Sequence, residues 1–433
     1  MVTPEGSAVA AGAALLALVL VVNGVLRARN GGAEMYLAPT VFPVAYIATA
    51  SLGPTLWIYS RSDLLGIGPS DLPSNTLLAM GLAVTAFCFG TMMPWPARHV
   101  DPAPLNGRLL AGVSRLAFFF PLGLAAHRYI TGYVGTRGQG QDVRDASDAV
   151  GVAAVLLAPA LVLLIAVARR QQRWPFGFAD LTIIAIFLVL QALNGDRASS
   201  IAIVLTVSIA LVLRRESDGR LRPLILGLAA IGSLAYVTST LRTQEVAPSA
   251  SGLGFIETTL QDFVSIPYTT GVVLQNVELS GAAGGTTVIA ALIRQLPSPL
   301  ATRLIGPVDD TGTFVFREMV GIGSSQGWGF SIPAEGALNF GMWGLIVASW
   351  LYGTLLRWLY SRASLKAGRA MSLCYFVAFA TLPFAWRSDA LGAIKGILYP
   401  AIFMAIVLAF ARQNRARLGG SCSHGLEARR DEG

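Results

Sequence analysis

The sequence is short of charge. Asp, Glu, Lys and Arg make up 13% of its 433 residues, whereas hydrophobic residues make up 54%. A soluble domain carries about 25% charged residues, so these side chains are too few to cover a water-facing surface. The composition excludes an ordinary soluble enzyme, a disordered chain and a nucleic-acid-binding protein. It predicts an all-α polytopic membrane protein.

Cysteine and histidine are also scarce, with three of each. Three cysteines exclude a disulfide framework and a zinc site, and Cys88 and Cys374 lie in apolar runs where we expect them to be buried. His99, His127 and His424 are too scattered to form a histidine-based metal site. No segment has the Walker spacing of a nucleotide-binding loop. We therefore expect no metal and no cofactor.

Long apolar runs are abundant. About eleven runs lack charge over most of their length and are long enough, or nearly so, to cross about 30 Å of hydrocarbon as helices. They cover residues 8–26, 37–59, 74–94, 109–127, 150–168, 177–194, 199–213, 223–240, 336–356, 370–386 and 391–411. Proline inside several of these runs is compatible with a spanning helix, because neighbouring groups satisfy the freed backbone.

Basic residues are unevenly distributed between the two sides of these runs. Glu5 precedes the first run and Arg27 and Arg29 follow it, the reverse of a cleaved signal peptide, so we expect an anchor with its N-terminus outside. With the runs alternating from there, 20 of the 32 Lys and Arg residues fall inside, all in short segments. This bias predicts a cytoplasmic C-terminus and accounts for the net charge of +8 without nucleic acid.

The runs divide the chain into four parts. Residues 1–240 hold spans one to eight, residues 241–335 form a long extracytoplasmic loop, residues 336–411 hold spans nine to eleven, and residues 412–433 form a cytoplasmic tail that we expect to be disordered. The loop contains two short apolar stretches with helical spacing, GFIETTLQDFVSIPY and TTVIAALIRQLPSPL. We expect both stretches to lie at the membrane interface, over the mouth of the bundle.

Basic residues on the outside break the orientation rule and therefore mark candidate sites. Four lie at span boundaries: Arg197 in the hairpin NGDRASS, Arg242 in TLRTQE, and Arg387 and Lys395 in WRSDALGAIKG. A guanidinium fixed at such a boundary can hold a phosphate or diphosphate through two hydrogen bonds. The structural alternatives are a hairpin turn, a snorkelling side chain and an ion pair that closes the hairpin. Arg137 and Arg317, in outer loops, are weaker candidates that can also be plain surface charges.

The segment GSSQGWGFSIPAEGALNFG, residues 323–341, leads into span nine and carries the carboxylate of Glu335. A carboxylate at a helix start can simply cap the helix, where the dipole stabilises it. Asn339, however, lies four residues on and on the same face, and Trp328 offers a flat face on which a sugar ring can stack. A polar, Gly-rich stretch at membrane depth is tolerated where it lines a cavity, which favours a functional Glu335. Asp389 is a second candidate acid.

Four segments together resemble the Wzy-type O-antigen and oligosaccharide repeat-unit polymerases. They are NGDR, GGTTVIAALIRQLPSPL, GSSQGWGFSIPAEGALNFGMWGL and RSDALGAIKGILYP. The resemblance runs from about Asp180 to Ile402, and Gly…Glu…Asn-Phe-Gly at the start of a span is its most specific part. It implies a GT-C-like inverting glycosyltransferase on the outer face of the cytoplasmic membrane. Such enzymes transfer a growing glycan from a polyprenyl diphosphate carrier to a new carrier-linked repeat unit.

The resemblance also implies roles and partners. The departing polyprenyl diphosphate gains negative charge that fixed cations can stabilise, and the residues expected to do so are Arg197, Arg242, Arg387, Lys395, Arg317 and Arg137. Glu335 is the first candidate base for the acceptor hydroxyl and Asp389 the second, while Asn339 and Trp328 orient sugar. The expected partners are a polyprenyl-diphosphate-linked oligosaccharide, the lipid bilayer, a chain-length regulator and a flippase, and no nucleic acid.

Two other functions stay open. An outer-face ligase uses the same donor but hands finished glycan to a different acceptor; it is disfavoured because the only outer-side histidine is His127, at a span end. A lipid-linked oligosaccharide transporter or flippase often has paired halves with broken helices at mid-membrane, and no such pairing is visible in the sequence. The sugars, the linkage, the oligomeric state and the class of polysaccharide stay open.

Overall fold

The computed structural model describes residues 4–31, 36–60, 64, 67–96, 104–130, 157–172, 174–194, 197–214, 226–227, 260, 263–296, 298–306, 311–320 and 330–427. Within these ranges the chain is all-helical, apart from an isolated β-bridge between Leu64 and Ile67. Three helices are long and apolar enough to cross a membrane: Pro4–Ala28, Gly107–Ile130 and Ala390–Arg412. Shorter apolar helices accompany them, so the prediction of a helical membrane protein is confirmed at this level.

The helices follow the predicted runs closely. Their bounds are α1 (Pro4–Gly31), α2 (Phe42–Ser60), α3 (Thr76–Met92), α4 (Gly107–Ile130), Leu157–Ala168, α6 (Phe178–Leu193), α7 (Arg197–Arg214), α10 (Ser265–Ser280), α11 (Thr286–Ile293), α12 (Ser298–Ile305), α13 (Gly312–Met319), α14 (Ile332–Tyr360), α15 (Ala370–Ala385) and α16 (Ala390–Glu427). Each predicted run falls on one of them except 223–240, which lies outside the described residues apart from 226 and 227.

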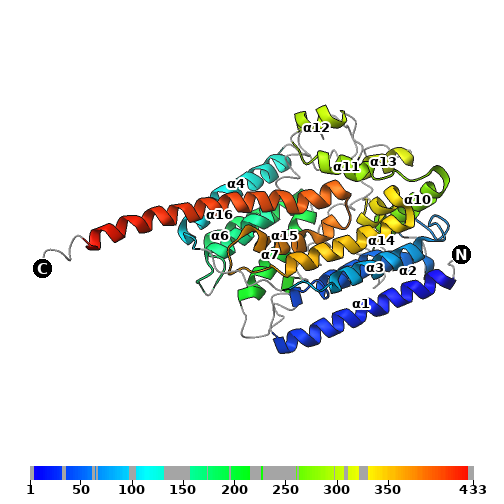
Figure 1. The fold of residues 1–433 in the computed structure, drawn as a ribbon, viewed down its shortest axis with the longest axis horizontal. Coiled ribbons are helices and arrows are strands. Elements are labelled where there is room, and N and C mark those ends of the chain that lie inside the picture. The colour runs from blue at the N-terminus through cyan, green and yellow to red at the C-terminus, as the bar shows by residue number, and fades with distance from the viewer. Residues whose placement is uncertain are drawn as a thin grey trace.

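The helices lie side by side in an elongated bundle, with the two termini at opposite ends (Figure 1). α14 packs against α3 and α10, α1 packs against α3, and α4 packs against α6. The short helices α10 to α13 gather toward the end of the bundle at which α1 begins. α16 also starts at this end, so the predicted loop and the predicted site residues on α16 share one end of the molecule.

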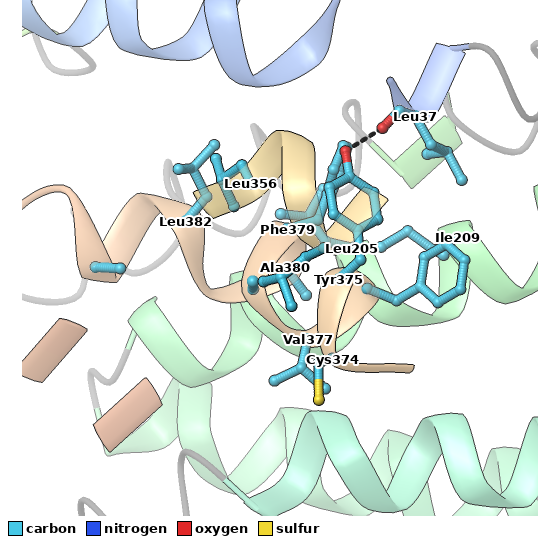
Figure 2. Close-up of a cluster of buried hydrophobic side chains, with 14 of the residues drawn as sticks. Leu37, Leu205, Ile209, Leu356, Cys374, Tyr375, Val377, Phe379, Ala380 and Leu382 are labelled. Carbon is cyan, nitrogen blue, oxygen red and sulfur yellow. Dashed lines mark hydrogen bonds between the residues drawn. The ribbon is translucent and has the colours of Figure 1, made fainter. Parts of the chain in front are cut away.

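α15 forms the centre of the bundle. All its residues from Ser372 to Leu382 are buried, and it contacts α2, α7, α14 and α16. A helix that is apolar on every side packs in this way. Figure 2 shows this core, with Leu205 and Ile209 of α7 and Leu356 of α14 around it. The hydroxyl of Tyr375 donates to the backbone oxygen of Leu37, and Cys374 and Cys88 are buried and free, as predicted.

α16 continues beyond its membrane-length segment. It runs as one helix to Glu427 (Figure 1), whereas the sequence predicted a disordered tail from residue 412. That prediction was wrong for residues 412–427, and residues 428–433 lie outside the described part of the chain. The segment lacks proline, and six of its first seven residues, 412–418, are Arg, Gln, Ala or Leu, which favour a helix without needing an apolar partner.

The predicted span 336–356 contains a break. α14 leaves helical geometry at Phe340 (φ −143°, ψ 22°) and Gly341 (φ 63°, ψ −149°), and the positive φ suits glycine. The parts before and after the break press together, because a Cβ on Gly336 would lie 2.2 Å from the backbone oxygen of Gly344. α14 is therefore a short helical segment, 332–339, joined by a sharp bend to a longer one.

The backbone groups freed by this break are satisfied from another part of the chain. Leu338 O accepts from Ala283 N at 2.9 Å, and Asn339 O accepts from Gly284 N at 3.0 Å. Polar backbone groups inside a membrane protein require such partners. The turn between α10 and α11 therefore caps the short segment of α14 and brings the start of α11 beside it.

A partly buried ion pair joins α4 and α6. Arg115, in the predicted span 109–127, donates from Nε to Asp180 Oδ1 at 2.6 Å and from Nη2 to Oδ2 at 3.2 Å. Arg169 Nε lies 3.4 Å from Oδ2, and Gly177 N donates to the same oxygen at 2.7 Å. Charges within a membrane protein are usually paired in this way, and this pair holds α4 against the start of α6.

Candidate active site

Glu335 is buried in the first turn of α14, with 3% of its surface exposed. The helix start is encoded locally, because Pro333 suits the first turn and Ser331 Oγ accepts from Ala334 N at 3.2 Å as the N-cap. Ser331 therefore performs the capping role that the sequence left open for Glu335. The carboxylate of Glu335 turns instead to α11.

A hydrogen-bond relay holds one oxygen of this carboxylate. Thr287, the second residue of α11, donates from Oγ1 to Glu335 Oε1. Asn339 Nδ2 donates to Thr287 Oγ1 at 2.7 Å and to the backbone oxygen of Glu335 at 2.8 Å. A hydroxyl has a single proton to donate, so Thr287 gives that proton to Oε1 while it accepts from Asn339.

The second oxygen, Glu335 Oε2, is buried and has no hydrogen-bond partner among the described residues. It lies against Gly312, the first residue of α13, where a Cβ would come within 1.9 Å of it. Only glycine leaves room for the carboxylate in this position. An acceptor oxygen that is desolvated yet unpaired is costly, and such atoms are rare enough in folded proteins to point to a function.

Asp389 lies beside Glu335 and is 7% exposed. Its Oδ1 accepts from Gly392 N at 2.9 Å, which makes it the N-cap of α16. Its Oδ2 accepts from Thr313 Oγ1 of α13 at 2.8 Å. Both oxygens of Asp389 are thus engaged, in contrast to Oε2 of Glu335, so Asp389 is the poorer candidate for a group that takes up a proton.

Four helices begin around the carboxylate of Glu335. Thr287 is in the first turn of α11, Gly312 starts α13, Glu335 itself is in the first turn of α14, and the backbone N–H of Ala390 at the start of α16 stabilises its charged form. Helix N-termini carry partial positive charge and expose N–H groups suited to anions. The site therefore combines a buried carboxylate with surroundings that favour a second, anionic group.

Glu335 precedes the predicted span 336–356, and its surroundings set its proton affinity. Burial raises the pKa of Glu335 to about 7, and the negative charge of Asp389 also raises it, while the hydrogen bonds from Thr287 and Asn339 and the nearby backbone N–H of Ala390 oppose the rise. A carboxylate with a pKa near neutrality can take up and release protons at physiological pH.

The structure brings together three of the predicted site residues, Glu335, Asn339 and Asp389. Arg387 lies two residues before Asp389, and its Nε donates to Ser265 Oγ of α10 at 3.1 Å. Arg317 is one turn after Thr313 on α13, hence on the same face; its Nε is buried without a hydrogen bond among the described residues. Lys395 lies in the second turn of α16.

The other predicted site residues are not placed relative to this site. α7 begins at Arg197, but the side chain of Arg197 lies outside the described part of the structure. Arg242, Arg137 and Trp328 also lie outside the described residues. Of the cations expected to hold a diphosphate, the structure therefore describes the side chains of Arg387, Arg317 and Lys395 alone.

Three residues that contact the carboxylates were missed in the sequence. Thr287, Gly312 and Thr313 lie 48, 23 and 76 residues from their partners, so no local spacing connects them. A weak signal was present, since both GGTT and DDTGT place small polar residues directly before a short apolar helix. Such segments are suited to helix starts that approach another backbone closely.

No family model matches the chain, and no curated protein and no solved structure matches it either. The fold and the site define a class of protein: a helical membrane protein with a buried carboxylate at one end of the bundle.

Proposed function

We propose that this chain is a membrane glycosyltransferase that polymerises polyprenyl-diphosphate-linked oligosaccharide repeat units on the outer face of the cytoplasmic membrane. The observation that carries the proposal is the half-satisfied carboxylate of Glu335, at the meeting point of four helix starts in a largely apolar bundle. The resemblance of residues 180–402 to the Wzy-type polymerases supports it, because Glu335, Asn339 and Asp389 all belong to the segments that carry the resemblance.

In the proposed reaction, Oε2 of Glu335 accepts the proton of an acceptor-sugar hydroxyl. The hydroxyl oxygen bonds to the anomeric carbon of the growing glycan as the bond from that carbon to the diphosphate breaks. The electron pair leaves with the polyprenyl diphosphate, and a base on one face with a leaving group on the other inverts the anomeric centre. Thr287 and Asn339 hold Oε1, so that Oε2 is the oxygen presented to the acceptor.

The departing diphosphate needs positive charge where it leaves. In the proposal, Arg387, Arg317 and Lys395 supply part of this charge, and the starts of α13 and α16 supply the rest. Arg197, Arg242 and Arg137 are proposed to contribute from the other outer segments. Asp389 caps α16, and through its negative charge it strengthens proton binding by Glu335.

The same proposal includes the finer topology: about eleven spans, a GT-C-like arrangement, an outer N-terminus and a cytoplasmic C-terminus. The positive-inside bias supports this orientation, and the position of the termini at opposite ends of the bundle agrees with it (Figure 1). A flippase that delivers lipid-linked units and a chain-length regulator are the partners proposed for such an enzyme.

The experiment is to incubate the purified protein with a defined polyprenyl-diphosphate-linked repeat unit and to resolve the products by size. We expect a ladder of repeat units from the wild-type protein and from the control variant Glu318→Gln, which alters an exposed carboxylate on α13. We expect no ladder from Glu335→Gln. A single transfer to a non-repeat acceptor would instead identify a ligase. Movement of lipid-linked sugar across vesicles, with no change in glycan length, would identify a flippase.

A further inference from the structure

α11 runs alongside the beginning of α16. At its start, Thr287 contacts Glu335, whose charge is stabilised by the backbone N–H of Ala390. Just past its end, Gln295 O accepts from Tyr399 Oη at 3.4 Å. Residues 390 and 399 lie about 13 Å apart along a helix. Because Ala390–Arg412 is a candidate membrane span, α11 extends to the depth of the first turns of that span.

The face of α11 turned away from the bundle is apolar and exposed. Thr287, Ala290 and Ala291 are buried on the inner face. On the outer face, Ile289 is 57% and Leu292 is 54% exposed, and their spacing places them on one side of the helix. Side chains of this size, exposed next to one another, mark a surface that contacts something other than water.

α12 continues this surface. Its Leu300 is 49% exposed and Leu304, one turn later, is 62% exposed. Arg303 is exposed next to Leu304, and an arginine there can reach lipid headgroups while its stem stays among apolar groups. On α16, which α11 contacts, Ile402 is 51% exposed, so the candidate span beside α11 also has an apolar exposed face.

The backbone groups of the turn after α11 are hydrogen-bonded, as backbone groups inside hydrocarbon must be. Arg294 N donates to Ala290 O, Gln295 N donates to Leu292 O, and Leu296 N donates to Ile293 O, at 2.9–3.2 Å. The hydroxyl of Tyr399 then donates to the free oxygen of Gln295. Irregular backbone is tolerated at membrane depth where protein groups satisfy it, and here α16 provides such a group.

We propose that α11 and α12 form a re-entrant hairpin inserted into the membrane leaflet nearest the candidate active site, with lipid hydrocarbon chains covering its apolar face. The occupant is lipid because α11 packs against a candidate span whose own exposed face is apolar, and because the edge of the surface carries an arginine. The sequence predicted that this stretch lies at the membrane interface over the mouth of the bundle, and in the structure α11 packs against the first turns of α16. Such a hairpin is compatible with any activity of the protein, and its presence does not depend on glycosyl transfer.

The hairpin also lies close to the candidate active site. Thr287 lies on the same short helix as Ile289 and Leu292, so the residue that holds Glu335 is one turn from the lipid-covered face. A substrate with a lipid anchor can then approach the carboxylate from the bilayer side of the protein, without first leaving the membrane.

The test uses nitroxide labels on single cysteines in the full-length chain. Cys88, Cys374 and Cys422 are replaced by alanine or serine, and the protein is reconstituted in vesicles of phosphatidylethanolamine and phosphatidylglycerol. Labels are placed by Ile289→Cys, Leu292→Cys and Leu300→Cys. Power-saturation electron paramagnetic resonance then compares collisions with oxygen, which partitions into hydrocarbon, with collisions with a water-soluble nickel chelate.

Two matched positions calibrate the result. Ile402→Cys labels the exposed face of α16, and Glu318→Cys labels an exposed residue of α13. If the hairpin lies in the membrane, we expect the three labels to have a high ratio of oxygen to nickel collisions. The label at Ile402 should have a similarly high ratio, and the label at Glu318 a low one. A ratio like that of Glu318 would overturn the proposal. Protection from both reagents would also overturn it, because another protein surface would then cover the face.

Discussion

Two buried carboxylates of this protein are treated differently by their surroundings. Asp180, in the first turn of α6, receives hydrogen bonds on both oxygens from Arg115 and Gly177, and Arg169 lies close by. Glu335, in the first turn of α14, has one oxygen held by Thr287 and the other unpaired among the described residues. A carboxylate with both oxygens hydrogen-bonded holds helices together, whereas one with an unpaired buried oxygen keeps a cost that packing alone does not explain.

The charges around the two groups differ as well. Asp180 faces two guanidinium groups, so its negative charge is compensated by side chains that cannot lose their protons. Glu335 faces hydroxyl and amide groups, helix starts and a second carboxylate. The first arrangement favours a permanently ionised acid. The second favours an acid that changes its protonation state, which is what a general base must do.

The most direct test of this difference between Glu335 and Asp180 is to neutralise each acid in turn. Glu335→Gln is expected to lower turnover by about 10²–10⁴-fold, the range for loss of a general base, because the amide cannot accept the proton. Asp180→Asn is expected to keep turnover per folded molecule but to lower the free energy of unfolding by about 1.5–3 kcal/mol, the range for hydrogen bonds to charged groups. Polymerisation assays and thermal unfolding in detergent separate the two effects. Equal loss of turnover in both variants would contradict the distinction.

A second prediction concerns the glycine against Oε2. Gly312→Ala would place a Cβ 1.9 Å from Oε2 of Glu335, so the carboxylate must move. Turnover is therefore expected to fall by at least about tenfold, which is equivalent to about 1.4 kcal/mol of transition-state stabilisation. Gly123→Ala, in α4, is the matched control because its Cβ would meet no atom within 4 Å. Unchanged turnover in Gly312→Ala, measured on the same glycan ladder, would show that the position of Oε2 does not matter.

A third prediction sharpens the role assigned to the relay. Thr287→Val keeps the shape of the side chain but removes the hydroxyl, so Oε1 loses the donor that holds it. Turnover is expected to fall, and the pH at which activity is half-maximal is expected to rise, because the bond from Thr287 stabilises the charged form of Glu335. Thr287→Ser should restore both values. If the valine variant lost activity with no change in its pH profile, Thr287 would be a packing residue only.

A fourth prediction concerns stability as a function of pH. The pKa of Glu335 rises on folding from 4.5 to about 7, so the folded state binds more protons between these values and stability falls as pH rises through that window. Glu335→Gln removes this dependence. The variant should therefore have a higher melting temperature than wild type at pH 8, and the difference should shrink toward pH 4.5. A difference that is constant with pH would contradict the raised pKa.

The class of protein and part of the candidate site could be predicted from local sequence pattern. The apolar runs predicted the positions of the described spanning and core helices, because a helix needs only a sufficient length of apolar residues to enter hydrocarbon. The pairing of Glu335 with Asn339 also follows from spacing, since residues four apart share a helix face. The helical extension of α16 to Glu427 was missed because polar composition was taken as a sign of disorder.

The amino-acid sequence by itself determined that the chain is an all-helical membrane protein and that a carboxylate and an amide share the start of α14. Only the tertiary structure decided which oxygen of Glu335 is held and which has no partner among the described residues. That choice depends on Thr287 from α11, Gly312 from α13 and Ala390 from α16. Their meeting results from the break in α14 and the packing of short helices around it. Contacts over such separations in the chain depend on how whole helices pack, which local periodicity does not encode.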